Sequence, residues 1–210
     1  MWNERGRIPM LKTKNINLEV VKKPTMNKEV KQKTGRNRFL DSIMEGQITE
    51  DAFKAVAESR GNTVTKATKR DDIKKHIDYY IENKNGRVAS VDVKAKKRAF
   101  RGGERSSDIQ WAEFKNVRGE NGWMYGEAEY IAFEVDEAFL LFKRLDLLDY
   151  FTSKCSKESQ NNPQAMPKKG KPREMYTPYR RVDYDRLDSV IMFPMSDIVN
   201  DVPHRIWDKV

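Results

Sequence analysis

Three polar residues in one short segment have the side-chain types that metal-assisted chemistry on a phosphate requires. Asp78, Asp92 and Lys94 lie within residues 76–94. Mg²⁺ is commonly held by one or two carboxylates together with water and substrate phosphate. A lysine beside such a metal can orient a water molecule and offset negative charge on the reacting phosphate. The three residues therefore predict a Mg²⁺ site for phosphodiester cleavage.

The segment that carries these residues has the pattern of a β-hairpin. Asn85-Gly86 supplies the positive φ angles that a tight turn requires, and the valines that follow it favour a strand. Side chains alternate between the two faces of a strand. We therefore expect Asp92 and Lys94 on one face and Val91, Val93 and Ala95 on the other face, toward the core.

The segments on either side predict an α/β fold, a mixed β-sheet flanked by helices. The helical pattern covers 38–61 in two pieces, with Thr49 as an N-cap and Gly61 just past the end. A short amphipathic helix is expected over 145–151. Strand patterns lie at about 62–68, 75–82, 87–95, 111–117, 130–134, 139–143 and 188–193. The last of these is an apolar run that we expect to return to the core.

The net charge of +9 is unevenly distributed along the 210 residues. Residues 1–40 hold eleven Lys and Arg against three Glu, a charge of +8. Residues 84–118 and 154–181 each carry +6, so the rest of the chain is acidic. Concentrated basic segments favour a polyanionic partner such as nucleic acid. The alternative is a highly charged protein with loose basic tails.

Cysteine usage and hydropathy exclude several classes of protein. Cys155 is the single cysteine, which excludes an internal disulfide and a cysteine-rich zinc site. No apolar run approaches the ~18 residues of a membrane span, and the beginning of the sequence lacks the apolar core of a signal peptide. We expect a cytoplasmic protein without a membrane partner, in the host cytoplasm if a phage encodes it.

The order of helix, strand and hairpin, with Asp78 followed by Asp92-Val-Lys94, resembles the PD-(D/E)xK nuclease superfamily. The spacings from Glu50 through Gly61 to these residues are similar to those of its Holliday-junction-resolvase branch, which also includes phage-type nucleases. The resemblance covers about residues 48–96 and implies a restriction-endonuclease-like core. It departs from the family pattern before the first aspartate, where His76-Ile-Asp78 replaces the namesake Pro-Asp.

The resemblance implies a role for each matching position. Asp78 and Asp92 are the expected ligands of Mg²⁺, with Mn²⁺ as a substitute, and the carbonyl of Val93 is a further ligand. Lys94 is the expected catalytic lysine. Glu50, the expected acid of the first helix, is placed in the first turn, where it would hold a second metal or the attacking water. Glu58 is the alternative acid on that helix, and an ordinary acidic residue favoured by the helix dipole is the competing interpretation of Glu50.

Asp/Glu-x-Lys triplets are frequent in a chain with 35% charged residues, so a single triplet is weak evidence by itself. Glu113-Phe-Lys115 is the serious rival, because it also lies in a predicted strand with both charges on one face. If it were the true triplet, Asp92 would become the upstream carboxylate. The strand context and apolar flanks of Asp92 favour Asp92-Val-Lys94 over this rival.

Nucleic-acid contacts are expected from basic residues that follow the site and from one on the next strand: Lys96, Lys97, Arg98, Arg101, Arg105 and Lys115. Aromatic side chains at Trp111, Trp123 and Tyr125 are expected to pack in the core or in loops, and stacking on unpaired bases is the competing interpretation. His76 is expected to be a satisfied or exposed imidazole and not a catalytic base.

The chain is expected to have four segments: a basic arm, possibly disordered, over 1–40, a nuclease core over 41–153, a basic linker or long loop over 154–187, and a C-terminal strand and cap over 188–210. The predicted activity is metal-dependent cleavage of duplex or branched DNA by a phage or mobile-element endonuclease that processes recombination or replication intermediates. An inactive nuclease-fold protein that binds nucleic acid or protein is the alternative. DNA or RNA, endo- or exonuclease action, and monomer or homodimer stay open.

Overall fold

The computed structural model describes residues 35–98, 104–168, 171, 173–181 and 186–210. The expected basic arm over 1–40 falls almost wholly outside them. Within these residues, no helix is both long and apolar enough to cross a membrane. The boundaries of the four expected segments stay a prediction.

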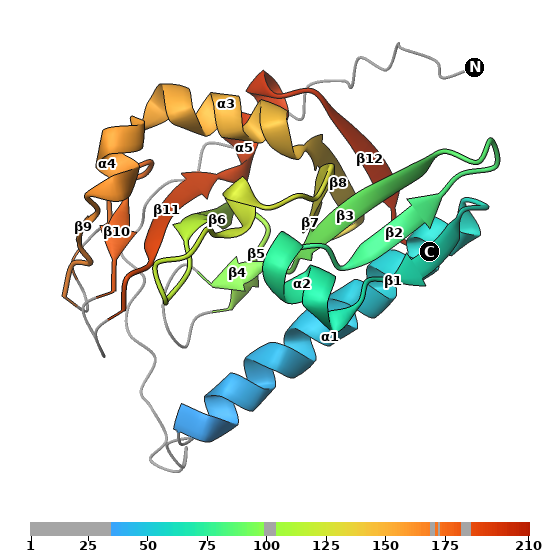
Figure 1. Ribbon diagram of the computed structural model, residues 1–210, viewed down its shortest axis with the longest axis horizontal. Coiled ribbons are helices and arrows are strands. Elements are labelled where there is room, and N and C mark those ends of the chain that lie inside the picture. Colours follow the sequence, from blue (N-terminus) through green and yellow to red (C-terminus); the bar gives the residue numbers. More distant parts are fainter. Residues whose placement is uncertain (1–34, 99–103, 169–170, 172, 182–185) are drawn as a thin grey trace, which may run out of the picture.

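A six-stranded mixed sheet forms the centre of the structure (Figure 1). Its strands, in spatial order, are β1 (Thr63–Lys66), β2 (Tyr79–Glu82), β3 (Val88–Lys94), β7 (Tyr130–Glu134), β8 (Ala138–Lys143) and β12 (His204–Asp208). β3 and β7 run parallel, and the other neighbours are antiparallel. The predicted α/β class with a mixed sheet flanked by helices is therefore confirmed.

A second sheet lies beside the first and includes the C-terminal return strand. Its strands, in spatial order, are β6 (Ile109–Lys115), β11 (Ser189–Pro194), β10 (Tyr179–Arg180) and β9 (Gln164–Ala165). β11 pairs antiparallel with β6 along six residues. A small hairpin of β4 (Lys97–Arg98) and β5 (Arg105–Ser106) joins the two sheets in sequence.

Helices cover both faces of the central sheet (Figure 1). They are α1 (Gly35–Ser59), α2 (Lys69–Lys75), the 3₁₀ turn η1 (Trp123–Tyr125), α3 (Arg144–Lys154), α4 (Lys157–Asn161) and α5 (Met195–Asp201). The long α1 packs against β1, β3 and β12. α3 contacts β8 and η1. α5 contacts β11 of the second sheet.

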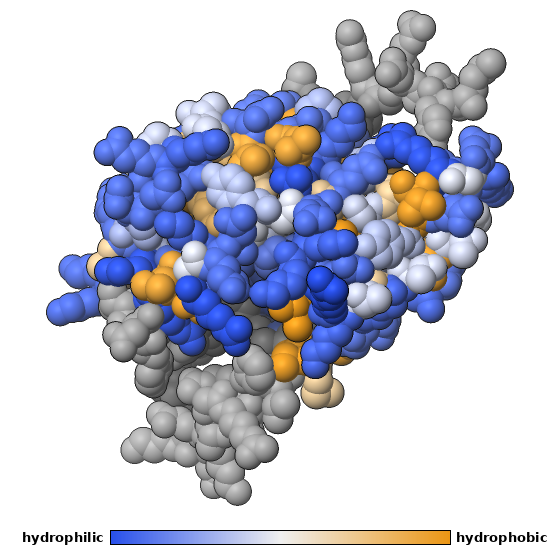
Figure 2. Space-filling view, in the orientation of Figure 1, coloured by the Kyte–Doolittle hydropathy of each residue, from blue (hydrophilic) through white to orange (hydrophobic). Residues whose placement is uncertain are grey.

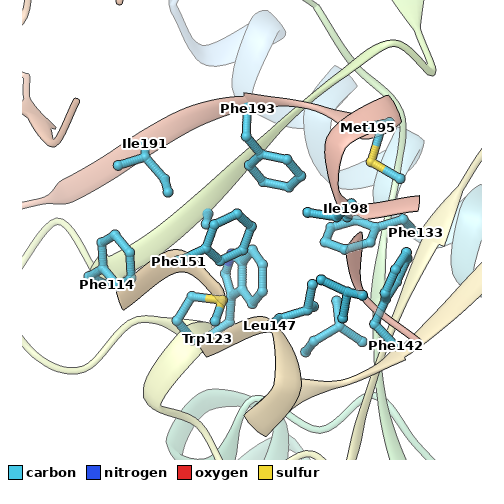
Figure 3. Packing of buried hydrophobic residues seen from close by; sticks show 14 of the residues in the cluster. Phe114, Trp123, Phe133, Phe142, Leu147, Phe151, Ile191, Phe193, Met195 and Ile198 are labelled. Atoms are coloured by element: carbon cyan, nitrogen blue, oxygen red, sulfur yellow. The ribbon is translucent and has the colours of Figure 1, made fainter. Parts of the chain in front are cut away.

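The hydrophobic core is divided by the central sheet. On the α1 side, Phe53 packs with the valines of β3 and with Trp207, whose ring is stacked 5.7 Å from that of Phe53. On the other side, aromatic and aliphatic residues of β7, β8, α3 and β11 interlock (Figure 3). Phe193 of β11 is fully buried there, 4.7 Å from Phe151 and 6.0 Å from Phe133 between ring centroids. The C-terminal strand therefore contributes directly to this core.

The turn between β2 and β3 differs in one detail from the expected one. Only Gly86 has a positive φ, at 75°, and Asn85 does not. Gly86 N donates to the Asn83 carbonyl, while the Asn83 side chain accepts from the backbone N–H groups of Asn85 and Arg87. These hydrogen bonds form a hairpin loop that is longer than a two-residue turn and has one glycine in the left-handed conformation.

Helix α1 is continuous, so the prediction that Thr49 caps its second piece is wrong. Thr49 lies inside the helix, where its hydroxyl donates to the Glu45 carbonyl at 3.2 Å and also contacts Glu134 at 3.1 Å. The end of the helix is as predicted. Gly61 has φ of 78°, and the bonds from Gly61 N to the Glu58 carbonyl and from Asn62 N to the Ala57 carbonyl form a Schellman motif.

The strand expected over 75–82 is shorter than predicted because α2 precedes it. Thr68 caps α2 by accepting from Asp71 N, and His76 ends it in the left-handed conformation with φ of 54°. The linker expected over 154–187 likewise contains short elements, namely α4, β9 and β10.

Truncating Phe193 tests the contribution of the return strand. Because Phe193 is fully buried between two other rings, we expect Phe193→Ala to lower the free energy of unfolding by about 3–5 kcal/mol. Leu145→Ala is the control, since this side chain is 60% exposed and its loss should cost no more than about 0.5 kcal/mol. Urea unfolding followed by circular dichroism measures both. Equal effects of the two substitutions would mean that the strand is dispensable for the core.

Candidate active site

The hairpin brings Asp78, which lies just before β2, next to Asp92 of β3. β2 pairs with β3 so that Tyr79 faces Val91, and Asp78 N donates to the Val91 carbonyl at 2.9 Å. The next residue on each strand is therefore an aspartate. Like charges opposite one another destabilise a sheet. A pair of facing carboxylates here is costly to the fold unless something offsets their charge.

Each aspartate is held by one neighbour. Asp78 Oδ2 accepts a hydrogen bond of 2.7 Å from Val93 N, because β2 begins only at Tyr79 and leaves that N–H without a backbone partner on this strand. Asp92 Oδ1 lies 2.5 Å from Lys94 Nζ. The side chains of Asp92 and Lys94 are 3% and 19% exposed, so this ion pair is poorly hydrated.

Asp92 Oδ2 is buried and has no N–H or hydroxyl partner among the residues that the structure describes, and its neighbour is the carboxyl of Asp78, which can donate to Asp92 when protonated. A buried carboxylate oxygen without a partner carries a large desolvation cost. The site thus has an oxygen available for a cation, next to a second carboxylate. This observation and the oxygen chemistry of the pair fit Mg²⁺, with waters and substrate completing its coordination. Within the described part of the chain, no group of three His, Cys, Asp or Glu side chains converges on one metal position.

The electrostatics of the pair differ from those of ordinary surface carboxylates. Burial, and then the nearby charge of Asp92, raises the pKa of Asp78 to about 7. Burial also raises the pKa of Asp92, although Lys94 opposes that shift. Burial disfavours the charged form of Lys94, but the carboxylates of Asp92 and Asp78 outweigh it and raise the pKa of Lys94. At neutral pH Lys94 is therefore charged, while Asp78 is near its midpoint of titration.

Trp123 and Tyr125 have different surroundings. The Trp123 ring lies below Lys94, with Nζ 5.2 Å from the ring centroid, and only 6% of Trp123 is exposed. It is therefore a core residue in contact with the lysine, as expected from the sequence. Tyr125 is half-buried, and its hydroxyl donates to Gln160 Oε1 at 2.6 Å.

Glu50 is not in the first turn of its helix, as we expected, but in the interior of α1. Its carboxylate lies 2.7 Å from Lys66 Nζ on β1. Burial raises the pKa of Glu50, Lys66 opposes this, and the charge of Asp78 raises it further. Glu50 is thus near Asp78. Glu58 pairs loosely with Lys54 on the exposed surface of α1, at 3.8 Å.

The rival triplet lies on β6 with its charges on one face, as expected. Burial raises the pKa of Glu113, and the charges of Lys94 and His76 oppose the shift. The charges of Glu113 and Lys94 therefore interact between the two sheets. The sequence carries no local signal for this interaction, because it depends on how the two sheets pack. His76 Nε2 lies 3.1 Å from the Asn121 carbonyl, so this imidazole has a backbone partner.

The basic residues expected to contact nucleic acid differ in their exposure and in their ion pairs. Lys96 Nζ lies 2.8 Å from Asp136, and Arg105 lies 2.5 Å from Glu45. Lys97 is exposed at the start of β4. Arg98 follows it in β4, and Arg101 lies outside the described residues. Ion pairs already engage Lys96 and Arg105, so contacts between these two and phosphates would require exchange of partners.

Comparison with known proteins gives one structural similarity. No family model and no curated protein sequence matches the chain. A solved structure of a bacterial homing endonuclease, I-Ssp6803I, superposes with a TM-score of 0.37 and 16% sequence identity, over 64% of this chain and 85% of that protein. Similarity at this level assigns neither a family nor an activity.

The raised pKa of Asp78 predicts how stability depends on pH. Between the unfolded value of 3.8 and the folded value of about 7, the folded protein binds more protons than the unfolded chain. The free energy of unfolding therefore falls as pH rises through this window. Asp78→Asn removes the charge and keeps an oxygen that can accept from Val93 N. In EDTA, we expect the variant to exceed the parent in stability by about 1–3 kcal/mol at pH 8 and by little at pH 4.

Asp136→Asn is the matched control for this experiment. Its side chain is 66% exposed, and a hydrogen bond from Lys96 is the main cause that lowers the pKa of Asp136. The control should not become more stable at high pH. Urea titrations at several pH values measure all three proteins. An advantage of Asp78→Asn that is the same at pH 4 and pH 8 would show that charge burial is not its cause.

Proposed function

We propose that this protein is a metal-dependent nuclease of the PD-(D/E)xK type that hydrolyses phosphodiester bonds in DNA, as an endonuclease acting on recombination or replication intermediates. The observation that carries the proposal is the convergence of Asp78, Asp92 and Lys94 at one point of the sheet. Register, an ion pair of 2.5 Å and a buried carboxylate oxygen without a described partner all support it. The basic segments of the chain support a polyanionic substrate.

Each residue has a distinct role in this proposal. Asp92 and Asp78 would hold Mg²⁺, or Mn²⁺ in its place, together with the Val93 carbonyl. When bound, the metal polarises the phosphate and lowers the pKa of a bound water. Asp78 would be kept in orientation by its bond from Val93 N. Glu50 would contribute a carboxylate near Asp78, from the interior of α1.

Lys94 would act as a fixed positive charge and not as a general base. The surrounding carboxylates raise its pKa, so the ammonium form persists at neutral pH. Trp123 supports the ammonium from one side and Asp92 from the other. A charge held in this way needs little reorganisation when negative charge develops on the phosphate.

A nuclease-fold protein that binds nucleic acid without cutting it is the second candidate. Two observations favour it. Lys94 already neutralises Asp92, and the described residues hold no cluster of three metal-ligating side chains. Both candidates predict DNA binding, and cleavage in Mg²⁺ separates them.

Substitutions at the site test the proposal. We expect Asp92→Asn and Lys94→Ala each to reduce cleavage at least about a hundredfold, because they remove a metal ligand and the charge beside the reacting phosphate. Glu113→Gln should cost much less, since Glu113 lies on the second sheet and is not one of the proposed metal ligands. The assay incubates linear, nicked, branched and single-stranded DNA with Mg²⁺ or with EDTA.

Asp136→Asn and Lys143→Ala are matched controls on exposed residues of the same types. They should cleave like the parent. Parental cleavage rates in either site variant would refute the assignment. Loss of activity in Glu113→Gln with retention in Lys94→Ala would instead favour the rival triplet, in which Asp92 stays a ligand. DNA binding by the parent without cleavage in Mg²⁺ or Mn²⁺ would favour the second candidate.

A further inference from the structure

A pocket of about 220 Å³ lies beside the candidate site, between the second sheet and α4. Its volume corresponds to roughly seven water molecules in the liquid, enough for a ring-sized group. Phe114, Tyr125 and Gln160 form its inner wall, and Lys115, Lys157 and Asn161 are among the residues that line it. The pocket is distinct from the aspartate pair but shares strand β6 with Glu113.

The inner wall offers an aromatic surface. Phe114 is 1% exposed and fixed in the core, and the Tyr125 ring lies 6.1 Å from it. The Tyr125 hydroxyl is bound by Gln160, whose amide nitrogen in turn donates to the Cys155 carbonyl. These bonds hold the half-buried Tyr125 ring in place. A fixed aromatic ring is a suitable platform for a planar base.

The rim offers positive charge and amides. Neither Lys115 nor Lys157 has an acidic partner among the residues that the structure describes. Asn121 and Asn161 are exposed at the same opening. Two free ammonium groups suit phosphates, and the amides can both donate to and accept from a base edge. In Figure 2 hydrophilic side chains dominate one face of the molecule, and apolar ones form only small separate patches.

The pocket is connected to the candidate site through His76. The Asn121 carbonyl on its rim contacts His76, which precedes Asp78 by two residues, at most about 7 Å of extended chain. Phe114 directly follows Glu113, which approaches Lys94. The rim of the pocket is therefore in direct contact with the segment that carries Asp78.

We propose that this pocket receives one unpaired nucleotide of the substrate strand, with its base against Tyr125 and its flanking phosphates at Lys115 and Lys157. This inference rests on the proposed function and adds a substrate class, namely DNA with an unpaired nucleotide near the scissile phosphate. Extruding a base costs least where it is already unpaired. Such a pocket would therefore favour bulged, branched or single-stranded DNA over a fully paired duplex.

Binding assays in EDTA test this inference separately from cleavage. The probes are fluorescent duplexes of one sequence that are fully paired, carry one bulged nucleotide, or carry an abasic residue at the bulge. We expect the parent to bind the bulged duplex about tenfold more tightly than the paired or the abasic one. Asn161→Trp, which fills the pocket without changing charge, should remove this preference. Asn162→Trp, at the neighbouring exposed residue outside the pocket, should retain it.

Removal of the two lysine charges at the rim of the pocket provides a second test. Lys115→Ala with Lys157→Ala should weaken binding of the bulged duplex and reduce its salt dependence, because two phosphate contacts are lost. Lys54→Ala with Lys143→Ala changes the net charge equally on exposed residues away from the pocket and should have a smaller effect.

Several outcomes would overturn the inference. A preference for the bulge that survives Asn161→Trp would place the unpaired nucleotide elsewhere. Equal binding of the abasic probe would mean that only phosphates are recognised. A free nucleoside monophosphate that binds as tightly as the bulged duplex would assign the pocket to a small ligand. In each case cleavage that still depends on Asp92 and Lys94 would leave the proposed function standing, whereas failure to bind any of the DNA probes would contradict both proposals.

Discussion

Two carboxylates that face one another across an antiparallel strand pair are the constraint on which the candidate site depends. The pairing of Tyr79 with Val91 brings Asp78, just before β2, next to Asp92, and the two carboxyl groups interact. Burial disfavours their charges, so the pair requires compensation. Lys94 supplies part of it, and a proton on Asp78 supplies more at neutral pH. In the proposed function, a bound cation would supply the rest.

The surrounding fold holds this pair in place from three directions. Phe53 of α1 packs beneath the valines of β3. On the opposite face, Trp123 supports the lysine and is itself packed 6.0 Å from Phe133. The second sheet brings Glu113 toward the same lysine and is anchored by β11, whose Phe193 is fully buried. Residues more than a hundred positions downstream of Asp78 thus contribute to the rigidity of the site.

The sequence was sufficient to predict those elements of the fold that depend on neighbouring residues alone. Valine-rich alternation predicted β3 and its two faces, and Gly61 marked the end of α1 through its positive φ. The sequence did not predict α2, because six of its seven residues are charged and none is buried, so it has no apolar period. Thr49 was misassigned because an N-cap residue type also fits inside a helix when its hydroxyl has partners, here Glu45 and Glu134. Edge strand β12 was missed because most of its residues are not buried.

For the candidate site, the sequence indicated which residues could converge but not what surrounds them. The spacing of Asp78, Asp92 and Lys94 around a turn was enough to expect them on adjacent strands. The ion pair between Glu50 and Lys66, and the approach of Glu113, depend on how a helix and a second sheet pack on the first. No local pattern encodes such packing, which is set by long-range contacts.

The central claim is that Asp78 and Asp92 share one divalent ion. Crystals of the protein soaked in Mn²⁺ test this directly, because anomalous scattering locates the ion without reference to activity. The account predicts one strong peak between the two carboxylates, about 2.1 Å from an oxygen of each, and its loss in Asp92→Asn. A peak bound elsewhere, or the absence of any peak at the aspartate pair while Lys94 keeps its contact with Asp92, would contradict it.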